Sequence, residues 1–459
     1  MFRIVELPLW LLILILAFAA VTALSHFLLP SVRWFFRRRM EKVVAKLNER
    51  LDRPIQPFKL ARRHDMIQRL IYDPVVIEAV AKHAQSTGVR EDVAFQRATQ
   101  YAREIVPSFS ATAYFGFAIK LARWLSRAFY RVRLGRLSEM ELEQVDHDAT
   151  VIFVMNHRSN MDYVLVTYLA AERTALSYAV GEWARVWPLN RLIRAMGAYF
   201  IRRKMRNPLY STVLARYVKL ATANGVMQAV FPEGGLSLDG RVGAPKLGLL
   251  SYIISEFNPD EGRDIVFVPV ALNYDRVLED RVLIAAADAG MRKFKFRMRT
   301  AAKYFIRHLW HRISGRFLRF GYAAVSFGEP LSLREFSAGN DGDLVDSVGH
   351  EVMGRVRNLI PVLPVPLAAT CLLAADKPLS RDELIAALSE RVARLKASGI
   401  SVRLPHKTAD YAVEVALSHL LMRSMVSETD AGIVVNPDDT ALLRYYANSI
   451  AHFFDAGAA

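Results

Sequence analysis

The sequence contains a single cysteine, Cys371, among its 459 residues. One thiol excludes an intramolecular disulfide and any zinc site built from several cysteines. Cys371 lies in an apolar run over residues 368–375, so we interpret it as a small core residue. The chain also lacks internal repeats and low-complexity tracts. Only 23% of its residues are charged and 53% are hydrophobic, which excludes a disordered chain.

Acidic residues are scarce relative to basic ones: 45 Asp and Glu against 61 Lys and Arg give a formal net charge of +16. Such a chain needs an anionic partner, which can be nucleic acid, anionic lipid or an anionic substrate. Residues 292–319 hold ten Lys or Arg, two His and several aromatics without one acidic residue. This composition favours an anionic membrane surface. A solvated helix face is the alternative, and no nucleic-acid motif accompanies the segment.

Polar residues are almost missing from residues 7–29, where only Thr22, Ser25 and His26 interrupt an apolar run. Roughly 20 such residues cross a bilayer as a helix. The basic flank follows the run, at residues 33–46, whereas a signal peptide has its basic residues first. We therefore predict a membrane anchor helix over residues 7–29, as a single span or within one leaflet. The positive-inside bias then places the basic flank and everything after it on the cytoplasmic side of the cell (inner) membrane. A buried soluble helix is the alternative.

Three regions are predicted after this anchor. Residues 31–135 are predicted to be helical, with helices separated at Pro54, Pro57, Pro74 and Pro107. Residues 140–335 alternate short β-branched runs with helical stretches, which predicts an α/β fold with a mostly parallel sheet. Expected strands cover 150–155, 176–180, 226–231, 265–272 and 323–327, with helices at 162–171 and 207–223. Residues 340–459 are predicted to be a helical C-terminal region.

His157 and Asp162 are the first candidates for chemistry, because they follow the expected strand at 150–155. Five residues apart, they diverge on one continuous helix. They converge if His157 lies in the loop after the strand and Asp162 in the opening turn of the next helix. The carboxylate then fixes the tautomer of the imidazole, and the other ring nitrogen takes a proton from a hydroxyl. A structural pair, with Asn156 as a helix cap, is the alternative.

Three later segments add candidates. Gly197-Ala-Tyr-Phe-Ile-Arg-Arg203 places two guanidinium groups after an apolar run. Phe231-Pro-Glu-Gly-Gly-Leu-Ser-Leu-Asp-Gly-Arg241 is a glycine-rich loop after a strand, whose amides can hold an anion. Val268-Pro-Val270 leads into Tyr274-Asp-Arg276 at the end of another strand. Each segment alone is compatible with a turn or a solvated charge.

In this order, the four segments resemble the glycerophospholipid acyltransferase family, and most closely its glycerol-3-phosphate acyltransferase branch. The matched blocks are HRSxxDY at His157–Tyr163, GAFFIRR at Gly197–Arg203, FPEGGRSRTGR with PKxG at Phe231–Gly248, and VPVxxxYDRV at Val268–Val277. The C-terminal Tyr445-Tyr446-Ala-Asn448 with His452 resembles that branch's YYxNxxxH segment. The resemblance covers residues 80 to 455.

The resemblance implies a membrane-bound enzyme of phospholipid biosynthesis. His157 would deprotonate the acceptor hydroxyl, which attacks the thioester of an acyl-CoA or acyl-carrier protein, and Asp162 would hold His157. Glu233 would contribute to acceptor binding, and loop amides at Glu233–Gly235 to the oxyanion or phosphate. The remaining candidates for substrate binding are Arg158, Arg202, Arg203, Gly234, Gly235, Ser237, Arg241, Lys246 and Arg276. This chemistry requires no metal and no cofactor beyond the acyl donor.

One departure concerns the acceptor. Where the family block has Arg-Ser-Arg after EGG, this chain has Leu236-Ser237-Leu238. Either the remaining basic residues hold the phosphate, or the acceptor differs. The leading hypothesis is acylation of the sn-1 hydroxyl of glycerol 3-phosphate, and the alternative is 1-acylglycerol 3-phosphate or another lipid acceptor. A catalytically silent lipid-binding protein is a third class, against which the intact His157, Asp162 and Glu233 argue.

Overall fold

The structure of the protein is a computed structural model. It describes residues 8–17, 38–39, 41–134, 145–170, 175–181, 189–202, 207–290, 320–340, 342–400, 402, 404 and 408–455. Residues 1–54 and 55–459 form two compact units. In the first unit, residues 9–17 and 41–48 are helical. No helix among the described residues combines the length and the apolar character needed to cross a membrane. Residues 18–29 of the predicted anchor and the basic segment 292–319 lie outside the described residues.

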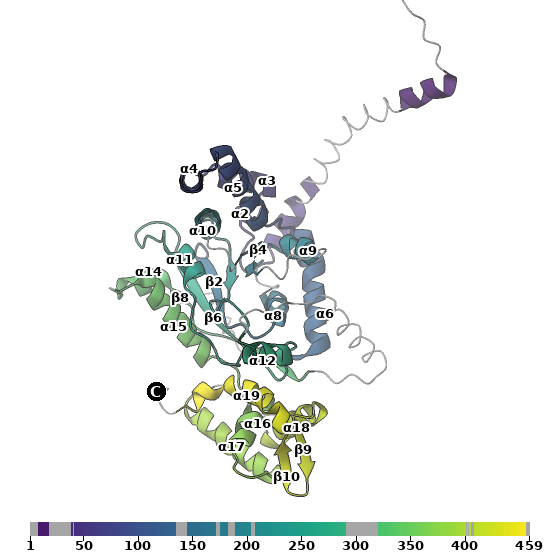
Figure 1. Ribbon diagram of the computed structural model, residues 1–459, viewed down its shortest axis with the longest axis vertical. Helices are drawn as coiled ribbons and strands as arrows, with labels where there is room; N and C mark the ends of the chain where they lie inside the picture. The colour runs from purple at the N-terminus through teal and green to yellow at the C-terminus, as the bar shows by residue number, and fades with distance from the viewer. Residues whose placement is uncertain are drawn as a thin grey trace, which may run out of the picture. The chain divides into compact units, whose positions relative to one another are not determined.

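An eight-stranded sheet organises the second unit (Figure 1). Its strands run in the order β1-β7-β6-β2-β5-β3-β4, and β8 pairs with β6. Strands β6, β2, β5, β3 and β4 are mutually parallel, whereas β7 and β8 run antiparallel to β6. The strand bounds are β1 Arg131–Leu134, β2 Thr150–Met155, β3 Ser177–Val180, β4 Tyr199–Phe200, β5 Gln228–Val230, β6 Ile265–Tyr274, β7 Tyr322–Phe327 and β8 Leu331–Ser332. The predicted α/β class and the mostly parallel sheet are confirmed.

The two central strands are β2 and β6, and every residue of both is buried. Strands covered on both faces are expected to be continuously apolar, which is why the run Thr150-Val-Ile-Phe-Val-Met155 identified β2. The five strands expected from the sequence are all present. The short strands β1, β4 and β8 were not predicted.

Helices pack against the sheet and against one another. α15 packs on β2 and β6, α10 packs on α4, α5 and α11, and α6 packs on α8. The helices up to residue 358 are α2 Pro57–Leu60, α3 Arg63–Ile71, α4 Pro74–Thr87, α5 Glu91–Ile105, the π-helix η1 Thr112–Ala118, α6 Ile119–Phe129, α8 Met161–Ala170, α9 Leu189–Ala195, α10 Pro208–Ala223, α11 Gly248–Ile254, α12 Asp280–Asp288, α14 Leu333–Ala338 and α15 Leu344–Asn358.

The segment predicted to be helical over residues 31–135 ends in a short strand that was not predicted. Arg131–Leu134 forms β1, which pairs in parallel with β7 in the register Arg131↔Tyr322 to Leu134↔Val325. Val132 packs against the core between the more exposed Arg131 and Arg133, which is the alternation of an edge strand. These four residues follow a helical sequence with no turn signal between them, so the boundary between α6 and β1 could not be predicted.

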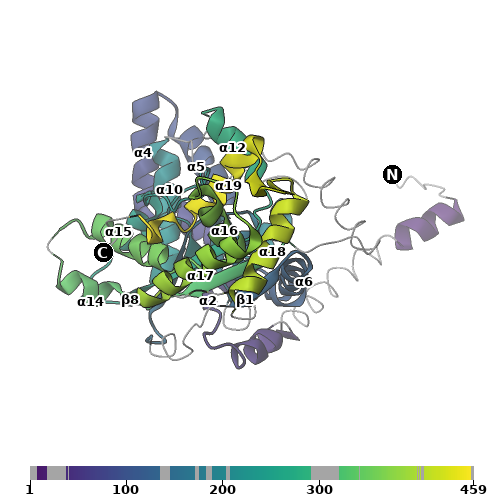
Figure 2. The same cartoon turned by 90° about the horizontal axis from the view of Figure 1, so that it is seen from below.

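The C-terminal part is a cluster of helices, shown from below in Figure 2, with one small hairpin whose strands Figure 1 labels. Its elements are α16 Pro364–Leu373, α17 Arg381–Ala397, α18 Ala409–Met422, β9 Val426–Thr429, β10 Gly432–Val435, the 3₁₀ turns η4 Pro437–Asp439 and η5 Ala451–Phe453, and α19 Thr440–Asn448. α16 is buried at its centre and contains Cys371, which is a core residue as predicted. The β9–β10 hairpin was not predicted within this helical region. Gly432 permits this hairpin, because it has a φ of +118° and lies against the carbonyl of Leu379.

Candidate active site

The candidate site begins where β2 ends at Met155. The side chain of Asn156 donates to the carbonyl of Leu272 at 3.0 Å and accepts from the amide of Leu272 at 2.8 Å. The carboxamide therefore continues the pairing of β2 with β6 by one residue and does not cap the next helix. This pairing fixes the direction in which the chain leaves the sheet, and it holds His157 at the carboxyl ends of the parallel strands.

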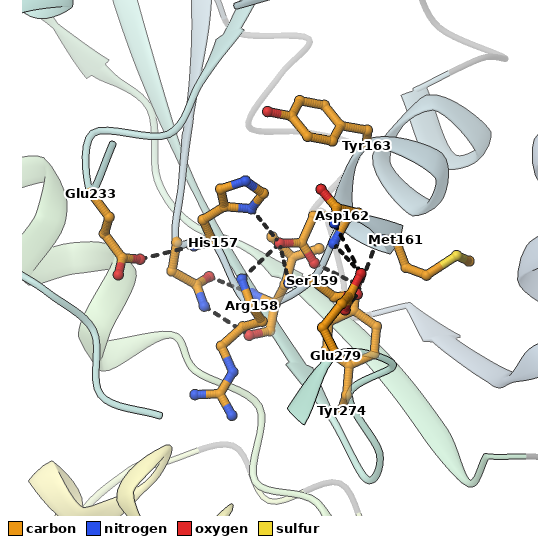
Figure 3. A network of polar contacts seen from close by, with 12 residues as sticks. His157, Arg158, Ser159, Met161, Asp162, Tyr163, Glu233, Tyr274 and Glu279 are labelled. Carbon is orange, nitrogen blue, oxygen red and sulfur yellow. Dashed lines mark hydrogen bonds and ion pairs between the residues drawn. The ribbon is translucent and has the colours of Figure 1, made fainter. Parts of the chain in front are cut away.

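Asp162 is held by four donors in the opening turn of α8 (Figure 3). Its Oδ2 lies 2.9 Å from Nδ1 of His157 and accepts from the amides of Arg158 at 2.7 Å and Ser159 at 3.0 Å. Its Oδ1 accepts from the hydroxyl of Tyr274 at 2.6 Å. Loop and helix turn thus bring His157 and Asp162 together as the spacing predicted. Because the carboxylate accepts from Nδ1, the neutral ring is the tautomer whose Nε2 is basic.

Two aromatic rings fix the plane of the His157 imidazole. Phe231 stacks on it, with ring centroids 4.2 Å apart, and Tyr163 meets its edge at 5.4 Å. His157 is 2% exposed. The imidazole therefore has a defined tautomer and orientation in a largely dry setting, which are the requirements for a general base in acyl transfer.

Glu233 supports the backbone of His157. Its Oε1 accepts from the amide of His157 at 2.8 Å, and its Oε2 accepts from the amide of Gly243 at 3.2 Å. Burial raises the pKa of this carboxyl to about 7, against the opposing effect of those two amides. The carboxylate thus joins the glycine-rich loop to the catalytic loop, by which we mean residues 156–160 between β2 and α8. Its predicted contact with the acceptor stays a prediction.

The rest of the glycine-rich loop surrounds the same backbone. The amide of Ser237 donates to the carbonyl of His157 at 2.9 Å, and the Ser237 hydroxyl closes a turn by bonding Gly240 and Arg241. Gly234 has a φ of +68° and its amide donates to the Phe231 carbonyl, so that amide is already bonded within the turn. Gly235 follows in the same loop, half-buried. Lys246 crosses the loop, with Nζ 2.7 Å from the carbonyl of Glu233.

Arg158 is 2% exposed and lies between the catalytic loop and the C-terminal helix. Its Nη1 donates to the carbonyl of Gly240, and its guanidinium carbon lies 5.0 Å from the ring centre of Tyr445. Nε and Nη2 have no hydrogen-bond partner among the described residues. Arg158 therefore keeps donor groups beside Gly240 and Tyr445.

The other predicted arginines are dispersed. Arg202 forms a two-pronged ion pair with Glu104, at 2.8 and 2.5 Å, and Arg241 lies 3.5 Å from Asp455. Arg276 stacks on Phe320 at 4.1 Å from the ring centre. Arg203 lies outside the described residues. Arg158 and Lys246 thus contact the glycine-rich loop, and Arg241 is its last residue, whereas Arg202 and Arg276 contact other segments.

Leu236 and Leu238, which replace the family arginines, are half-buried and pack against the hydrophobic core. Their side chains supply apolar surface beside Ser237 where the family block has two guanidinium groups. Any anion at this loop must therefore be held by other residues, and Arg158 and Lys246 contact the loop directly.

Two supporting residues were not identified as site residues from the sequence. Tyr274 closes β6 and bonds Asp162, and its place at the end of a strand was an available signal. Glu279 accepts from the Ser159 hydroxyl at 2.8 Å and from the Asn160 side chain at 3.0 Å. Burial raises the pKa of Glu279. Nothing in its sequence neighbourhood marks Glu279, because its partners are more than a hundred residues away.

Comparison with known families agrees with this geometry. Residues 136–273 match the sequence model of the acyltransferase family, and residues 309–458 match that of the glycerol-3-phosphate acyltransferase C-terminal region. The first match contains the His157–Asp162 pair and Glu233, and the second contains α19. The chain therefore matches two acyltransferase sequence models, in agreement with the resemblance seen in its sequence.

Curated relatives carry the name of one branch of that family. A glycerol-3-phosphate acyltransferase of Aeromonas hydrophila is 31% identical over 426 residues, which are 86% of this chain and 50% of the relative. A glycerol-3-phosphate acyltransferase of Pseudomonas fluorescens is 28% identical over 422 residues, or 86% of this chain and 48% of the relative. The chain thus spans about half the length of the curated relatives it matches.

Among solved structures, the 1-acyl-sn-glycerophosphate acyltransferase of Thermotoga maritima aligns with 53% of this chain and 78% of its own. The sequence identity is 20% and the TM-score 0.31. A likeness at this level carries no weight for the acceptor.

Proposed function

We propose that the protein transfers an acyl group from a thioester, acyl-CoA or acyl-carrier protein, to the sn-1 hydroxyl of glycerol 3-phosphate in phospholipid biosynthesis. The observation that carries this proposal is the oriented pair of His157 and Asp162, 2.9 Å apart at the carboxyl ends of a parallel sheet. The matches to the two acyltransferase sequence models and the names of the curated relatives support the same reaction.

The reaction follows from the tautomer of His157. Nε2 takes the proton of the acceptor hydroxyl while the oxygen of that hydroxyl attacks the thioester carbonyl. The bond between carbon and oxygen forms, and the carbonyl oxygen becomes an oxyanion. Asp162 stabilises the imidazolium that results. When the carbon–sulfur bond breaks, the thiolate takes the proton back from Nε2, and His157 is neutral again. No step needs a metal ion.

Arg158, Arg241 and Lys246 are the cations we propose for the acceptor phosphate, because Arg158 and Lys246 contact the glycine-rich loop and Arg241 is its last residue. Arginine suits this role, since its fork bonds phosphate oxygens in pairs. Arg202, Arg203 and Arg276 stay predicted substrate-binding residues. The half-buried Leu236 and Leu238 favour a second candidate acceptor with an apolar chain, 1-acylglycerol 3-phosphate.

We further propose that the protein works at the cytoplasmic face of the cell (inner) membrane. Support comes from the apolar run at residues 7–29 and the basic segment at 292–319. In the described part, Phe117 and Trp124 are 56% and 43% exposed beside the exposed Lys120 and Arg127. Exposed aromatics with flanking basic residues suit a lipid surface of negative charge. Protease access in sealed vesicles tests the orientation, and a cytoplasmic N-terminus would contradict a single span.

An acceptor screen with labelled acyl-CoA and acyl-carrier protein tests the reaction. We expect product with glycerol 3-phosphate and less or none with dihydroxyacetone phosphate or lysophosphatidate. Product with lysophosphatidate alone would overturn the glycerol 3-phosphate assignment. The His157→Ala variant should lose activity, whereas His350→Ala, on the exposed face of α15, should keep it. Full activity of His157→Ala would refute the mechanism.

A further inference from the structure

The C-terminal helix α19 presents two consecutive buried tyrosines to the catalytic part of the molecule. Tyr445 and Tyr446 meet at nearly perpendicular rings, with centroids 5.6 Å apart. Their hydroxyl groups have different surroundings. The Tyr445 hydroxyl has no hydrogen-bond partner among the described residues, whereas the Tyr446 hydroxyl has three.

Tyr446 bonds the segment between β6 and α12. Its hydroxyl donates to Asp280 Oδ2 and accepts from the amide of Val277 at 3.1 Å and from Nη1 of Arg423 at 3.0 Å. Arg423 also pairs with Asp280 at 2.7 Å, and both side chains are less than a tenth exposed. Tyr446 therefore bonds residues on both sides of Glu279, with Val277 before it in the chain and Asp280 after it.

Glu279 in turn holds the turn between His157 and Asp162. It accepts from the hydroxyl of Ser159 and from the side chain and amide of Asn160, at 2.8 to 3.3 Å. The amides of this turn are those that bond Asp162 and so set the His157 ring. A continuous chain of hydrogen bonds and backbone therefore leads from α19 to the catalytic pair.

We propose that Tyr446 is a positioning residue of the active site. It fixes Val277 and Asp280, which places the Glu279 carboxylate against Ser159 and Asn160 and keeps the turn to Asp162 in one geometry. The C-terminal region then contributes to catalysis without touching the reacting atoms. Displacements of about 1 Å at such sites are costly, up to about a hundredfold in rate. This inference rests on the proposed acyl transfer, since its main readout is turnover.

The test compares Tyr446→Phe with Tyr445→Phe in the full chain. Both variants keep the ring and lose one hydroxyl on the same helix, so Tyr445→Phe is a matched control. For Tyr446→Phe we expect kcat to fall about tenfold, with KM for acceptor and acyl donor nearly unchanged. Tyr445→Phe should retain wild-type kcat. Equal kcat for both variants and the wild type would overturn the proposal, as would an equal loss in both.

A double-mutant cycle with Glu279→Gln separates positioning from general stability. If Tyr446 acts through Glu279, the double variant should be little slower than Glu279→Gln alone. Independent losses that multiply would show that Tyr446 acts elsewhere. Thermal unfolding of each variant confirms that assays are run below its transition. A wild-type protein without any acyl transfer would refute the proposed function instead. Hydrogen exchange would then still test the link, because Tyr446→Phe should expose the amides of residues 158 and 159.

Discussion

The hydroxyl of Tyr274 lies 2.6 Å from Oδ1 of Asp162, on the oxygen opposite the one that faces His157. Asp162 therefore has no rotational freedom, since donors bind both of its oxygens. Tyr274 is the last residue of β6, so the central strand of the sheet directly orients the carboxylate of the catalytic pair.

Replacing Tyr274 with Phe should lower kcat by about three- to tenfold. Asp162 keeps its three bonds through Oδ2 but loses the one that prevents it from rotating. Steady-state kinetics with glycerol 3-phosphate measure the change. Tyr114→Phe is the control, since its hydroxyl also has a buried bond, to the amide of Leu176, away from the catalytic loop. Equal effects of the two variants would contradict a role for Tyr274 at Asp162.

An Asp162→Asn variant should lose about 10³-fold in kcat. Oδ2 accepts from the imidazole and two amides, and an amide nitrogen in its place can accept none of them. If the Asn oxygen takes that place instead, the uncharged side chain no longer stabilises the imidazolium. Nitrogen-15 spectra of His157 should show a change in tautomer or a lower pKa. A variant with wild-type kcat would exclude Asp162 as the partner of the base.

Gly240→Ala should weaken the contact between the glycine-rich loop and α19. Gly240 has a φ of +90°, and a Cβ there would lie 1.9 Å from the carbonyl oxygen of Tyr445. We expect a loss of at least about 2 kcal/mol in unfolding free energy, together with lower activity. Gly262→Ala separates the two causes, because Gly262 has a φ of +85° and open space around its Cβ. Similar losses in both variants would show that backbone strain alone is responsible.

The stability of the protein should depend on the protonation of Asp275. Its carboxylate accepts from the amides of Tyr322 at 2.8 Å and Val365 at 2.9 Å, and burial raises its pKa to about 7. The folded state thus binds a proton more tightly than the unfolded state, whose carboxyl has a pKa of about 3.9. Its contribution to stability is therefore greatest below about pH 4 and is lost as the pH rises to 7.

Asp275→Asn removes this titration. Chemical unfolding of wild type and variant between pH 4 and 8 should show a difference in unfolding free energy that changes by about 2–4 kcal/mol and levels off above pH 7. Glu233, whose pKa is also raised to about 7, contributes the same sign in both proteins and cancels in the comparison. A difference that is independent of pH would show that Asp275 does not titrate in this range.

The sequence was sufficient to predict those strands and helices that a local pattern of residues marks. β2 and β6 are long apolar runs between turns, and Asp162 had to lie at a helix start to reach His157. β1 and the β9–β10 hairpin were missed because strands of four residues give little periodicity beside long helices. Whether such a segment forms a strand depends on its pairing with distant strands, and a local sequence pattern does not show that pairing.

The candidate site shows the same division. The sequence blocks selected His157, Asp162 and Glu233, which the fold brings to one place. The partners of Arg202 and Arg276 are Glu104 and Phe320, far away in the chain, so their positions could not be derived. Glu279 was missed for the same reason, whereas Tyr446 lies in the C-terminal segment that carries the resemblance but was given no role there.

Glu233 and Ser237 hold the two sides of His157, one at its amide and the other at its carbonyl. Hydrogen bonds therefore join the first sequence block to the third, although about 70 residues separate them in the chain. An exchange of the glycine-rich loop with that of a relative would also reposition the catalytic base. Chimeras meant to change the acceptor should transfer residues 156–163 and 231–246 together.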